Sequence, residues 1–535
     1  MGCHRSFVIL ALVSCGACVV SQPRAAHAAG EHGAFVVTAL ADTIALERFE
    51  RNGDLVTGAL VFRLGGVRFD YSIMLASDGA VRRMESAARP AHADPTSAPT
   101  QSASMDWQAD SVLADVRPGT LQRIKSRAGS MAYVNPSIVM LELIVQRAFG
   151  TTPPLDSVPV FAVAGGRTLT AVVLRVGPDS VVVAMGAAEF GARVGPGGRL
   201  LSGGVAAQSV LFRRVDALPE AMLAVAPQDY SPPPGAPYTA ETVRVPSRGG
   251  FDLVGTLTWP RRAGRIPCVV TITGSGAEER DEALPVVRGY RPFRQIADTL
   301  ARRGIAVLRL DDRGTGESGG KFAGSTSADF ADDIEDALRW LRQVKDIDST
   351  RLALLGHSEG GMIAPLVASR DPRLAGMALL AGPAWTGRRI MEYQNARAVK
   401  RQFSGAAADS MMRVAMRGVD SLAGAEAWVG FFAKHDPLAI ARRLTSPPVL
   451  VLQGATDRQI AAEQATELAR AFRHAGNRDV TLRVLPATNH LFLPDTSGDP
   501  AGYPALKVNA IPRSTLGLIA DWFAARLLPH VAAKY

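Results

Sequence analysis

The pattern of apolar and polar positions along the chain changes near residue 227. Before that point, apolar residues mostly alternate with polar residues or glycine in short runs, as in Phe62 to Ile73, and turn signals such as Asn52-Gly53-Asp54 separate these runs. A period of two is typical of strands that bury one face. We therefore predict a β-rich, antiparallel N-terminal domain over residues 29–226, interrupted by one helix around Ser137 to Phe149.

Beyond residue 240, largely apolar runs alternate with stretches of helical periodicity. Cys268–Thr273 and Val449–Gln453 are such runs, and Ala328–Val344 is such a stretch. Strands that are apolar on both faces and joined by helices form parallel sheets covered on both sides. The predicted fold class for residues 241–535 is therefore α/β, with a doubly wound, mostly parallel sheet. Residues 386–445 break the alternation with mostly helical sequence, which predicts an inserted cap.

Two proline-rich stretches divide the chain. Residues 90–104 are rich in Ala, Ser, Thr and Pro, which predicts a flexible loop inside the N-terminal domain. Residues 227–240 contain Pro232-Pro233-Pro234 and predict a stiff linker between the two domains. The N-terminal domain shows no cluster of chemically active side chains. Its pattern is compatible with a lipocalin-like ligand cavity or with a packing or substrate-shielding domain.

The first 28 residues have the layout of a secretory signal peptide. Arg5 precedes an apolar run from Phe7 to Val20, and Ala26-His27-Ala28 supplies small residues at the cleavage positions. We therefore expect an exported protein, either periplasmic or secreted. The apolar run is shorter than the roughly 20 residues that cross a bilayer, so no transmembrane span is predicted. Leu12-Val13-Ser14-Cys15 resembles a bacterial lipoprotein box, so a lipid anchor at Cys15 is an alternative.

Composition narrows the classes of partner and cofactor. Hydrophobic residues make up 47% and charged residues 20% of the chain, as in folded soluble proteins. The formal net charge is +9, but the basic residues are scattered among acids, which argues against nucleic-acid binding. Only Cys268 lies outside the signal segment, so no intrachain disulfide is expected after cleavage. No spacing typical of metal ligands occurs, and we predict neither a metal nor a cofactor.

The first chemical signal is a nucleophile motif. Gly356-His357-Ser358-Glu359-Gly360 matches G-x-S-x-G and stands between the apolar strand Leu352–Leu355 and a helical stretch. A sharp strand-turn-helix needs glycines to avoid side-chain clashes, and it leaves the serine exposed. This context predicts that Ser358 is a catalytic nucleophile.

A serine hydroxyl is a weak nucleophile, so it needs a base and an acid that orients the base. In the expected chain order, these follow the serine as Asp or Glu and then His. Asp457 follows the strand Val449–Leu452, and His490 follows the last predicted strand, so both would lie in loops at strand ends. Asp436 is a rival acid, but it precedes that strand and belongs to the predicted cap. The other histidines lie in segments unsuited to a base: His4, His27, His32, His92, His357, His435, His474 and His530.

Acyl transfer by a serine also needs donors for an oxyanion. One expected donor is the backbone N–H of Glu359, the residue after the nucleophile. The second should come from the loop Gly274-Ser275-Gly276-Ala277, which follows the strand Val269–Thr273. We assign it to the N–H of Ser275, with Gly276 as the alternative.

Residues 241 to 525 resemble bacterial α/β-hydrolase esterases, relatives of the prolyl-oligopeptidase group. The matching segments are Gly274 to Asp281, Asp311 to Ser318 and Gly356 to Gly361. The resemblance implies a serine hydrolase that cleaves small-molecule carboxylic esters. A peptidase of prolyl-oligopeptidase type is one alternative, but the propeller repeats usual in that group are not seen here. A binding protein on an inactive hydrolase scaffold is the other.

A second glycine motif suggests different chemistry. Gly314-Thr315-Gly316-Glu317-Ser318-Gly319 fits G-x-G-x-x-G, the pattern of dinucleotide-binding loops. However, Asp311-Asp312-Arg313 separates it from its strand, and no helix opens at the third glycine. We interpret Asp311, Asp312 and Arg313 as turn and ion-pair residues that brace the floor of the active site.

Overall fold

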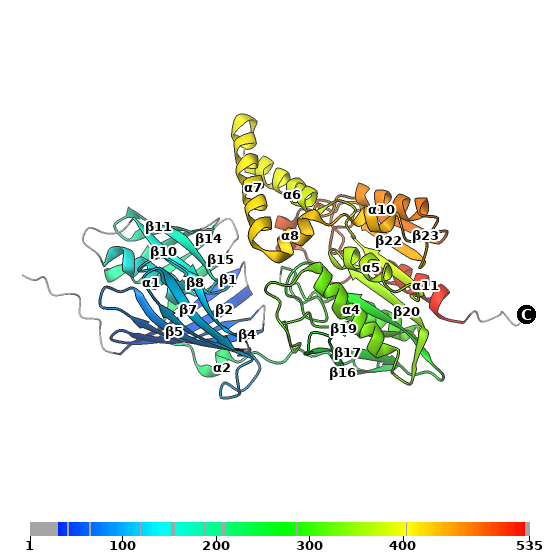
Figure 1. The fold of residues 1–535 in the computed structure, drawn as a ribbon, viewed down its shortest axis with the longest axis horizontal. Helices are drawn as coiled ribbons and strands as arrows, with labels where there is room; N and C mark the ends of the chain where they lie inside the picture. The colour runs from blue at the N-terminus through cyan, green and yellow to red at the C-terminus, as the bar shows by residue number, and fades with distance from the viewer. Residues whose placement is uncertain are drawn as a thin grey trace, which may run out of the picture. The chain divides into compact units, whose positions relative to one another are not determined.

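The computed structural model describes residues 30–39, 42–63, 66–117, 119–150, 156–185, 188–205, 210–284, 286–402 and 404–529. The expected signal peptide and the alternative lipid anchor at Cys15 lie outside these residues. The chain divides into two compact units. The first comprises residues 1–61, 69–88 and 99–223, and the second comprises residues 62–68, 89–98 and 224–535. Figure 1 shows the first unit as β-rich and the second as an α/β unit.

The β-rich unit is built on one 15-stranded sheet in the order β8-β7-β6-β5-β4-β3-β2-β1-β15-β14-β13-β12-β11-β10-β9. Neighbouring strands are consecutive in the chain except β1 and β15, and the pairings described are antiparallel apart from β9 with β10. β8 and β11 lie near opposite ends of the strand order, yet the Thr168 hydroxyl of β11 donates to the Ser126 hydroxyl just after β8. This contact shows that the sheet curls. Its strands are β1 (Glu31–Ala39), β2 (Asp42–Asn52), β3 (Leu55–Phe62), β4 (Val67–Leu75), β5 (Val81–Pro90), β6 (Gln101–Trp107), β7 (Ser111–Arg117), β8 (Leu121–Lys125), β9 (Met131–Tyr133), β10 (Ser157–Ala162), β11 (Arg167–Gly177), β12 (Ser180–Met185), β13 (Ala188–Val194), β14 (Leu200–Val205) and β15 (Val210–Val215).

One buried helix packs against this sheet. Helix α1 (Ile138–Phe149) buries nine of its 12 residues, which confirms the predicted helix. The buried carboxylate of Glu47 on β2 accepts hydrogen bonds from the N–H groups of Ile138 and Val139 at 2.7 and 3.0 Å. It also accepts from the hydroxyls of Ser137 and Tyr71 at 2.6 and 2.9 Å. Glu47 therefore satisfies donors at the start of α1 that would otherwise be buried without partners.

The first proline-rich stretch is more ordered than its composition suggested. Strand β5 ends at Pro90 and β6 begins at Gln101, so part of the expected flexible loop 90–104 belongs to the sheet. The linker region contains no helix or strand between α2 (Glu220–Leu223) and β16, which begins at Tyr238. Within it, the carbonyl of Asp229 accepts from Arg291 at 2.7 Å, so the linker is fixed to the α/β unit.

The α/β unit contains an eight-stranded sheet in the order β16-β17-β19-β18-β20-β21-β22-β23. Strands β16 and β17 pair antiparallel, β17 joins β19 antiparallel, and the remaining pairs described are parallel. This confirms the α/β class with a mostly parallel sheet after a β-rich domain. The strands are β16 (Tyr238–Pro246), β17 (Asp252–Pro260), β18 (Ile266–Ile272), β19 (Ala306–Leu310), β20 (Ile347–His357), β21 (Gly376–Leu380), β22 (Val449–Gly454) and β23 (Val480–Leu485).

Helices cover both faces of this sheet. Apolar residues of α4, α5 and α10 share one core with one face of the strands, and those of α3 and α11 share a second core with the other face. Cys268 and Val270 of β18 face the first core and Val269 faces the second, which explains why the sequence of this strand is largely apolar. The helices are α3 (Pro292–Arg302), α4 (Ser327–Leu341), α5 (Gly360–Ala368), α10 (Glu463–His474) and α11 (Arg513–Leu527).

Four helices lie between β21 and β22, within the segment interpreted as a cap (Figure 1). They are α6 (Gly387–Gln402), α7 (Gly405–Ala425), α8 (Ala427–Lys434) and α9 (Pro437–Ala441). No helix in the described part of the chain is both long enough and apolar enough to cross a membrane.

Candidate active site

Ser358 lies on a sharp turn between β20 and α5. Its φ of +52° falls in the left-handed region, which is strained for a residue with a side chain. The flanking glycines are required by close backbone contacts. A Cβ on Gly356 would lie 2.0 Å from the carbonyl oxygen of Gly360, and one on Gly360 would lie 2.2 Å from that of Ile272. The turn therefore packs tightly against β18 and holds Ser358 partly exposed at the carboxyl end of the sheet.

Asp457 and His490 meet at the same edge of the sheet. Asp457 follows the end of β22, and His490 lies in the loop after β23. The ring Nδ1 of His490 is 2.7 Å from Oδ2 of Asp457, and the two residues are only 4% and 2% exposed. A buried carboxylate at Nδ1 fixes the tautomer that leaves Nε2 free to accept a proton.

The carboxylate of Asp457 has four donors. Besides His490, Oδ2 accepts from Gln453 Nε2 at 2.8 Å, while Oδ1 accepts from the N–H groups of Gln459 and Ile460 at 2.8 and 2.9 Å. These four donors orient the carboxylate. The rival Asp436 instead caps α9, where its side chain accepts from the N–H groups at the helix start.

The loop carrying His490 is anchored next to the nucleophile turn. The imidazole of His357, which precedes Ser358, lies beside that of His490, with ring centroids 4.9 Å apart and ring planes tilted by 44°. Its Nε2 lies 3.0 Å from the backbone oxygen of His490. Ser358 Oγ and His490 have no hydrogen bond in the described structure. Such catalytic contacts are commonly long before substrate binds.

Two backbone N–H groups beside Ser358 have no hydrogen-bond acceptor within the described part of the chain, namely those of Glu359 and Ser275. The Gly274 N–H, by contrast, donates to Oε1 of Glu282 at 2.8 Å. The loop is close to the nucleophile, because a Cβ on Gly274 would lie 3.5 Å from Cβ of Ser358. Ser275 therefore remains suited to an oxyanion, and so does the alternative donor Gly276.

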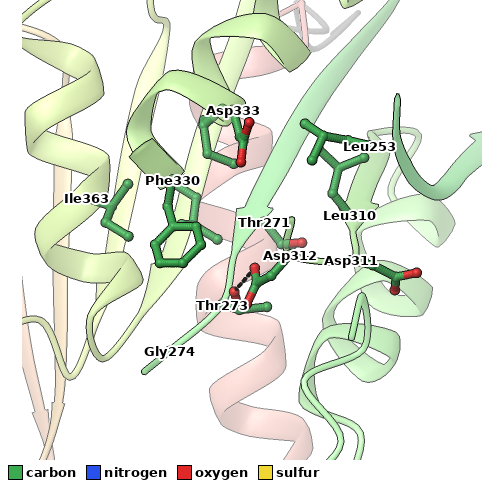
Figure 2. A pocket seen from close by; sticks show the side chains of 12 residues that line it. Leu253, Thr271, Thr273, Gly274, Leu310, Asp311, Asp312, Phe330, Asp333 and Ile363 are labelled. Atoms are coloured by element: carbon green, nitrogen blue, oxygen red, sulfur yellow. Dashed lines mark hydrogen bonds between the residues drawn. The ribbon is translucent and has the colours of Figure 1, made fainter. Parts of the chain in front are cut away.

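Acidic residues that follow β19 brace this loop. The carboxylate of Asp312 accepts from the hydroxyl of Thr273 at 2.7 Å, as Figure 2 shows, and from the N–H of Glu278 at 3.1 Å. Asp311 pairs with Arg280, which is fully buried, at 2.6 Å. Arg313 pairs with Asp333 at 2.6 Å. Asp311 and Arg313 are thus confirmed as ion-pair residues, whereas Asp312 braces the loop through hydrogen bonds from uncharged groups.

A small pocket of about 30 Å³ adjoins the loop (Figure 2). Its lining includes Thr273 and Gly274 of the loop, Asp312, Phe330 of α4 and Ile363 of α5. This volume accommodates a water molecule but not an ester substrate. Burial raises the pKa of Asp312 well above its usual value, although its hydrogen bonds from Thr273 and Glu278 act in the opposite direction.

The side chain of Glu359 connects the nucleophile turn to other elements. Its Oε1 accepts from the Ser327 hydroxyl of α4 at 2.6 Å and from Trp428 Nε1 of α8 at 2.9 Å. Burial raises the pKa of Glu359, while hydrogen bonds from Ser327, Trp428 and Ser275 lower it. Glu359, the residue after the nucleophile, thus links the nucleophile turn to the cap and to the Ser275 loop.

Nothing in the sequence indicated that Glu282 belongs to the site, nor what role His357 has there. Oε1 of Glu282 lies 2.8 Å from Nδ1 of His357, and both residues are buried. The motif around His357 was recognised, but it gave no signal for a partner 75 residues earlier in the chain.

The glycines of the second motif form a tight turn that packs against neighbouring parts of the same segment. The Gly314 N–H donates to the carbonyl of Gly319 at 2.7 Å, and a Cβ on Gly314 would lie 2.4 Å from the N atom of Phe322. Gly316 packs against Asp311, where a Cβ would lie 2.4 Å from its Oδ2. These glycines allow the bracing segment to fold tightly. In the described residues, no group of three His, Cys, Asp or Glu is placed to hold a metal ion.

Comparison with known proteins agrees with this architecture. Residues 291–501, which include Ser358, Asp457 and His490, match the prolyl oligopeptidase family. The chain is 28% identical over 282 residues to esterase EstD of Thermotoga maritima, covering 50% of this chain and 65% of the relative. It is 26% identical over 264 residues to dipeptidyl aminopeptidase BIII of Pseudoxanthomonas mexicana, covering 47% of this chain and 35% of the relative. The chain thus spans less than two thirds of either curated relative.

Among solved structures, an esterase of Pyrococcus furiosus matches with a TM-score of 0.40 and 17% identity. That match covers 56% of this chain and 96% of the esterase. The expected relationship to the prolyl-oligopeptidase group is confirmed by the family match and the esterase relative. The α/β unit of this chain has the α/β-hydrolase fold, and residues 291–501 are similar in sequence to the prolyl oligopeptidase family.

Proposed function

We propose that the protein is a serine hydrolase that cleaves carboxylic esters, with Ser358 as nucleophile, His490 as base and Asp457 as the acid that orients the base. The observation that carries the proposal is the 2.7 Å hydrogen bond between buried Asp457 and His490, at the sheet edge that also bears strained Ser358. Backbone strain at a partly exposed serine is typical of a functional position.

The reaction proceeds in two acyl-transfer steps. His490 Nε2 takes the proton of Ser358 Oγ while Oγ bonds to the ester carbonyl carbon, giving a tetrahedral oxyanion. The N–H groups of Glu359 and Ser275 donate to that oxygen. Collapse breaks the carbon–oxygen bond to the alcohol, which leaves with the proton from His490. Water then repeats the sequence on the acyl-enzyme and releases the carboxylic acid.

Ester substrates are favoured over peptides by the β-rich unit. Its strands form one continuous 15-stranded sheet, whereas propellers consist of separate four-stranded blades around a channel. The match also covers a larger share of the esterase relative than of the aminopeptidase relative, 65% against 35%. An inactive scaffold is disfavoured because all three positions hold residues competent for catalysis.

We propose further that the protein is exported, to the periplasm or the medium, on the basis of the sequence of residues 1–28. The N-terminus of the purified mature protein, determined by mass spectrometry, tests this. Cleavage after Ala28 supports a signal peptide. A diacylglyceryl-modified Cys15 at the N-terminus supports the lipoprotein alternative, and an uncleaved chain contradicts export.

The activity is tested with p-nitrophenyl esters of increasing acyl length, using residues 29–535 and the Ser358→Ala variant. We expect hydrolysis by the wild type and a loss of at least about a thousandfold in the variant, because the nucleophile is removed. A fluorescent phosphonate should label the wild type once per chain and leave Ser358→Ala unlabelled. Equal rates in the two proteins would contradict the assignment. Labelling without ester turnover would redirect the search to peptide substrates.

A further inference from the structure

His357 has a hydrogen-bond acceptor at each ring nitrogen. Its Nε2 lies 3.0 Å from the backbone oxygen of His490, and its Nδ1 lies 2.8 Å from Oε1 of Glu282. A carbonyl oxygen can only accept, so Nε2 must carry a proton. A second proton lies between Nδ1 and the carboxylate. The pair therefore holds two protons and is overall neutral, as a buried ion pair requires.

The electrostatics agree with a protonated imidazole. Burial acts to lower the pKa of His357, but the charge and hydrogen bond of Glu282, with the carbonyl of His490, raise it above its usual value. Glu282 itself is 1% exposed and holds a φ of +54°. A strained backbone at a buried glutamate indicates that the surrounding structure fixes this side chain in place.

The same carboxylate oxygen also holds the oxyanion loop. Oε1 of Glu282 accepts from the Gly274 N–H at 2.8 Å, and Gly274 precedes the expected donor Ser275. Three separate parts of the site thus converge on one pair. The Ser275 loop contacts the pair through the N–H of Gly274, and the nucleophile turn contributes His357 itself. The loop that carries His490 contacts the pair through the backbone carbonyl of that residue.

We propose that Glu282 and His357 are positioning residues, which hold the base His490 and the oxyanion loop in register with Ser358. This role rests on the proposed function and extends it to two further residues. Neither residue contacts the reacting atoms, so both act through His490 and the oxyanion loop. Small displacements of groups that position a base or an oxyanion donor reduce the rate of the chemical step by about a hundredfold. Ground-state binding of the ester should change little, because the pair does not touch substrate.

The isosteric variant Glu282→Gln separates this role from simple packing. Both contacts are made to Oε1, so an amide oxygen at that position can still accept from Gly274 and from His357, while the amide nitrogen takes the place of Oε2. Without the carboxylate charge, the ring of His357 also loses its second proton, and with it a donor to one of the two acceptors. We expect kcat to fall about 10- to 100-fold while KM stays within about threefold of the wild type.

A double-mutant cycle tests whether the two residues act as a unit. Glu282→Gln, His357→Ala and the double variant are compared by kcat and by the rate of phosphonate labelling of Ser358. If the pair acts as a unit, the double variant should be no worse than about threefold below the poorer single variant. Labelling should slow in parallel with kcat, because it depends on the same base.

Asp371→Asn provides the matched control. Asp371 is also buried in the α/β unit and pairs with Arg342 at 2.6 Å, but it lies beyond the other end of α5 from Ser358. This variant should melt at a lower temperature than the wild type while retaining its kcat. Circular dichroism establishes that each variant is folded, and Glu282→Gln alone decides the matter if His357→Ala does not fold.

The outcomes distinguish the two levels of inference. A folded Glu282→Gln variant with kcat within twofold of an active wild type would overturn the positioning role alone. Losses that multiply in the double variant would also overturn it. A wild type that neither hydrolyses esters nor reacts with phosphonate would overturn the proposed function, and the positioning role with it.

Discussion

Backbone strain is distributed unequally between the two units. Among the described residues of the β-rich unit, only glycines have a positive φ. In the described part of the chain, five non-glycine residues have a positive φ, and all belong to the α/β unit: Glu282, Ser358, Ala381, Ala487 and Phe492. Ser358, Ala381 and Ala487 directly follow strands β20, β21 and β23 or lie within two residues of their ends. Strain of this kind persists only where surrounding structure imposes it, and it gathers at functional sites.

The two units also differ in the partners that their buried carboxylates hold. Glu47 of the β-rich unit and Asp457 of the α/β unit each accept four hydrogen bonds. The partners of Glu47 are two hydroxyls and the N–H groups that begin α1, so its role is to fix a helix. One partner of Asp457 is an imidazole that can take up a second proton. Under the proposed mechanism, the same chemical group therefore serves stability in one unit and proton transfer in the other.

The largest expected effect is that of Asp457→Asn. The amide nitrogen would donate toward Nδ1 of His490, which favours the tautomer that cannot accept the proton of Ser358. We expect kcat for a p-nitrophenyl ester to fall by roughly three to four orders of magnitude, with a small change in melting temperature. Steady-state kinetics together with thermal denaturation measure both quantities.

Asp436→Asn is the control for this prediction, because Asp436 was the rival acid and caps α9. It should retain kcat within about twofold and lose about 1 kcal/mol of stability at most. The opposite ranking of the two variants would assign the catalytic acid to Asp436 and break the contrast between the two buried carboxylates.

Glu47→Gln should have the opposite signature to Asp457→Asn. Its amide nitrogen would face donors at the start of α1, so we expect the β-rich unit to lose about 2 kcal/mol of stability while ester turnover is unchanged. Hydrogen exchange of the α1 amides localises the loss. Glu50→Gln on the same strand is the control, because Glu50 is exposed. A tenfold loss of kcat in Glu47→Gln would show that the units are functionally coupled.

The pH dependence of Glu47 sharpens this prediction. Burial raises the pKa of Glu47, although its hydrogen bonds act in the opposite direction. A pKa that is higher in the folded state gives stability that is complete below the unfolded value of 4.5 and is lost as pH rises through the folded value. The wild type should therefore lose stability relative to Glu47→Gln as pH rises above the unfolded value of 4.5. Urea titrations over that range measure it, and parallel pH profiles would contradict the raised pKa.

The sequence predicted the features that depend on local pattern. Apolar runs identified the core strands of the α/β sheet, and the glycines around Ser358 identified the turn, because a Cβ there would meet backbone atoms. The chain order of serine, acid and base located Asp457 and His490, which the structure brings together. These signals are readable because each depends on residues close in sequence or on a fixed order of strand ends.

Features that depend on distant partners were not predictable. Glu282 contacts His357 across 75 residues, and Glu47 contacts Ser137 across 90. Each glutamate is one polar residue among many in its segment, and no spacing rule connects it with its partner. The curl of the β-rich sheet and the seating of α1 against it arise from similar long-range contacts. Burial of these carboxylates is the property that matters, and it appears only when the chain is folded.

The smallest expected effect concerns a polar group of the α/β unit away from the strand ends. Thr326 and Asp329 form a reciprocal cap at the start of α4, so Thr326→Ala should cost about 1 kcal/mol. Urea unfolding followed by tryptophan fluorescence measures this, since five of the six tryptophans lie in the α/β unit. Ser325→Ala is the control, because the exposed Ser325 hydroxyl donates only to the carbonyl of Lys321.

Turnover by Thr326→Ala locates the boundary of the catalytic network. The next residue, Ser327, donates to Glu359 beside the nucleophile, so the cap and the site are adjacent in sequence. If catalysis depends on groups at the strand ends alone, kcat should stay within about twofold of the wild type, because the remaining turns of α4 keep Ser327 in place. A tenfold loss would extend the network that positions Ser358 into α4. The division between stabilising and positioning groups would then run through the α/β unit rather than between the two units.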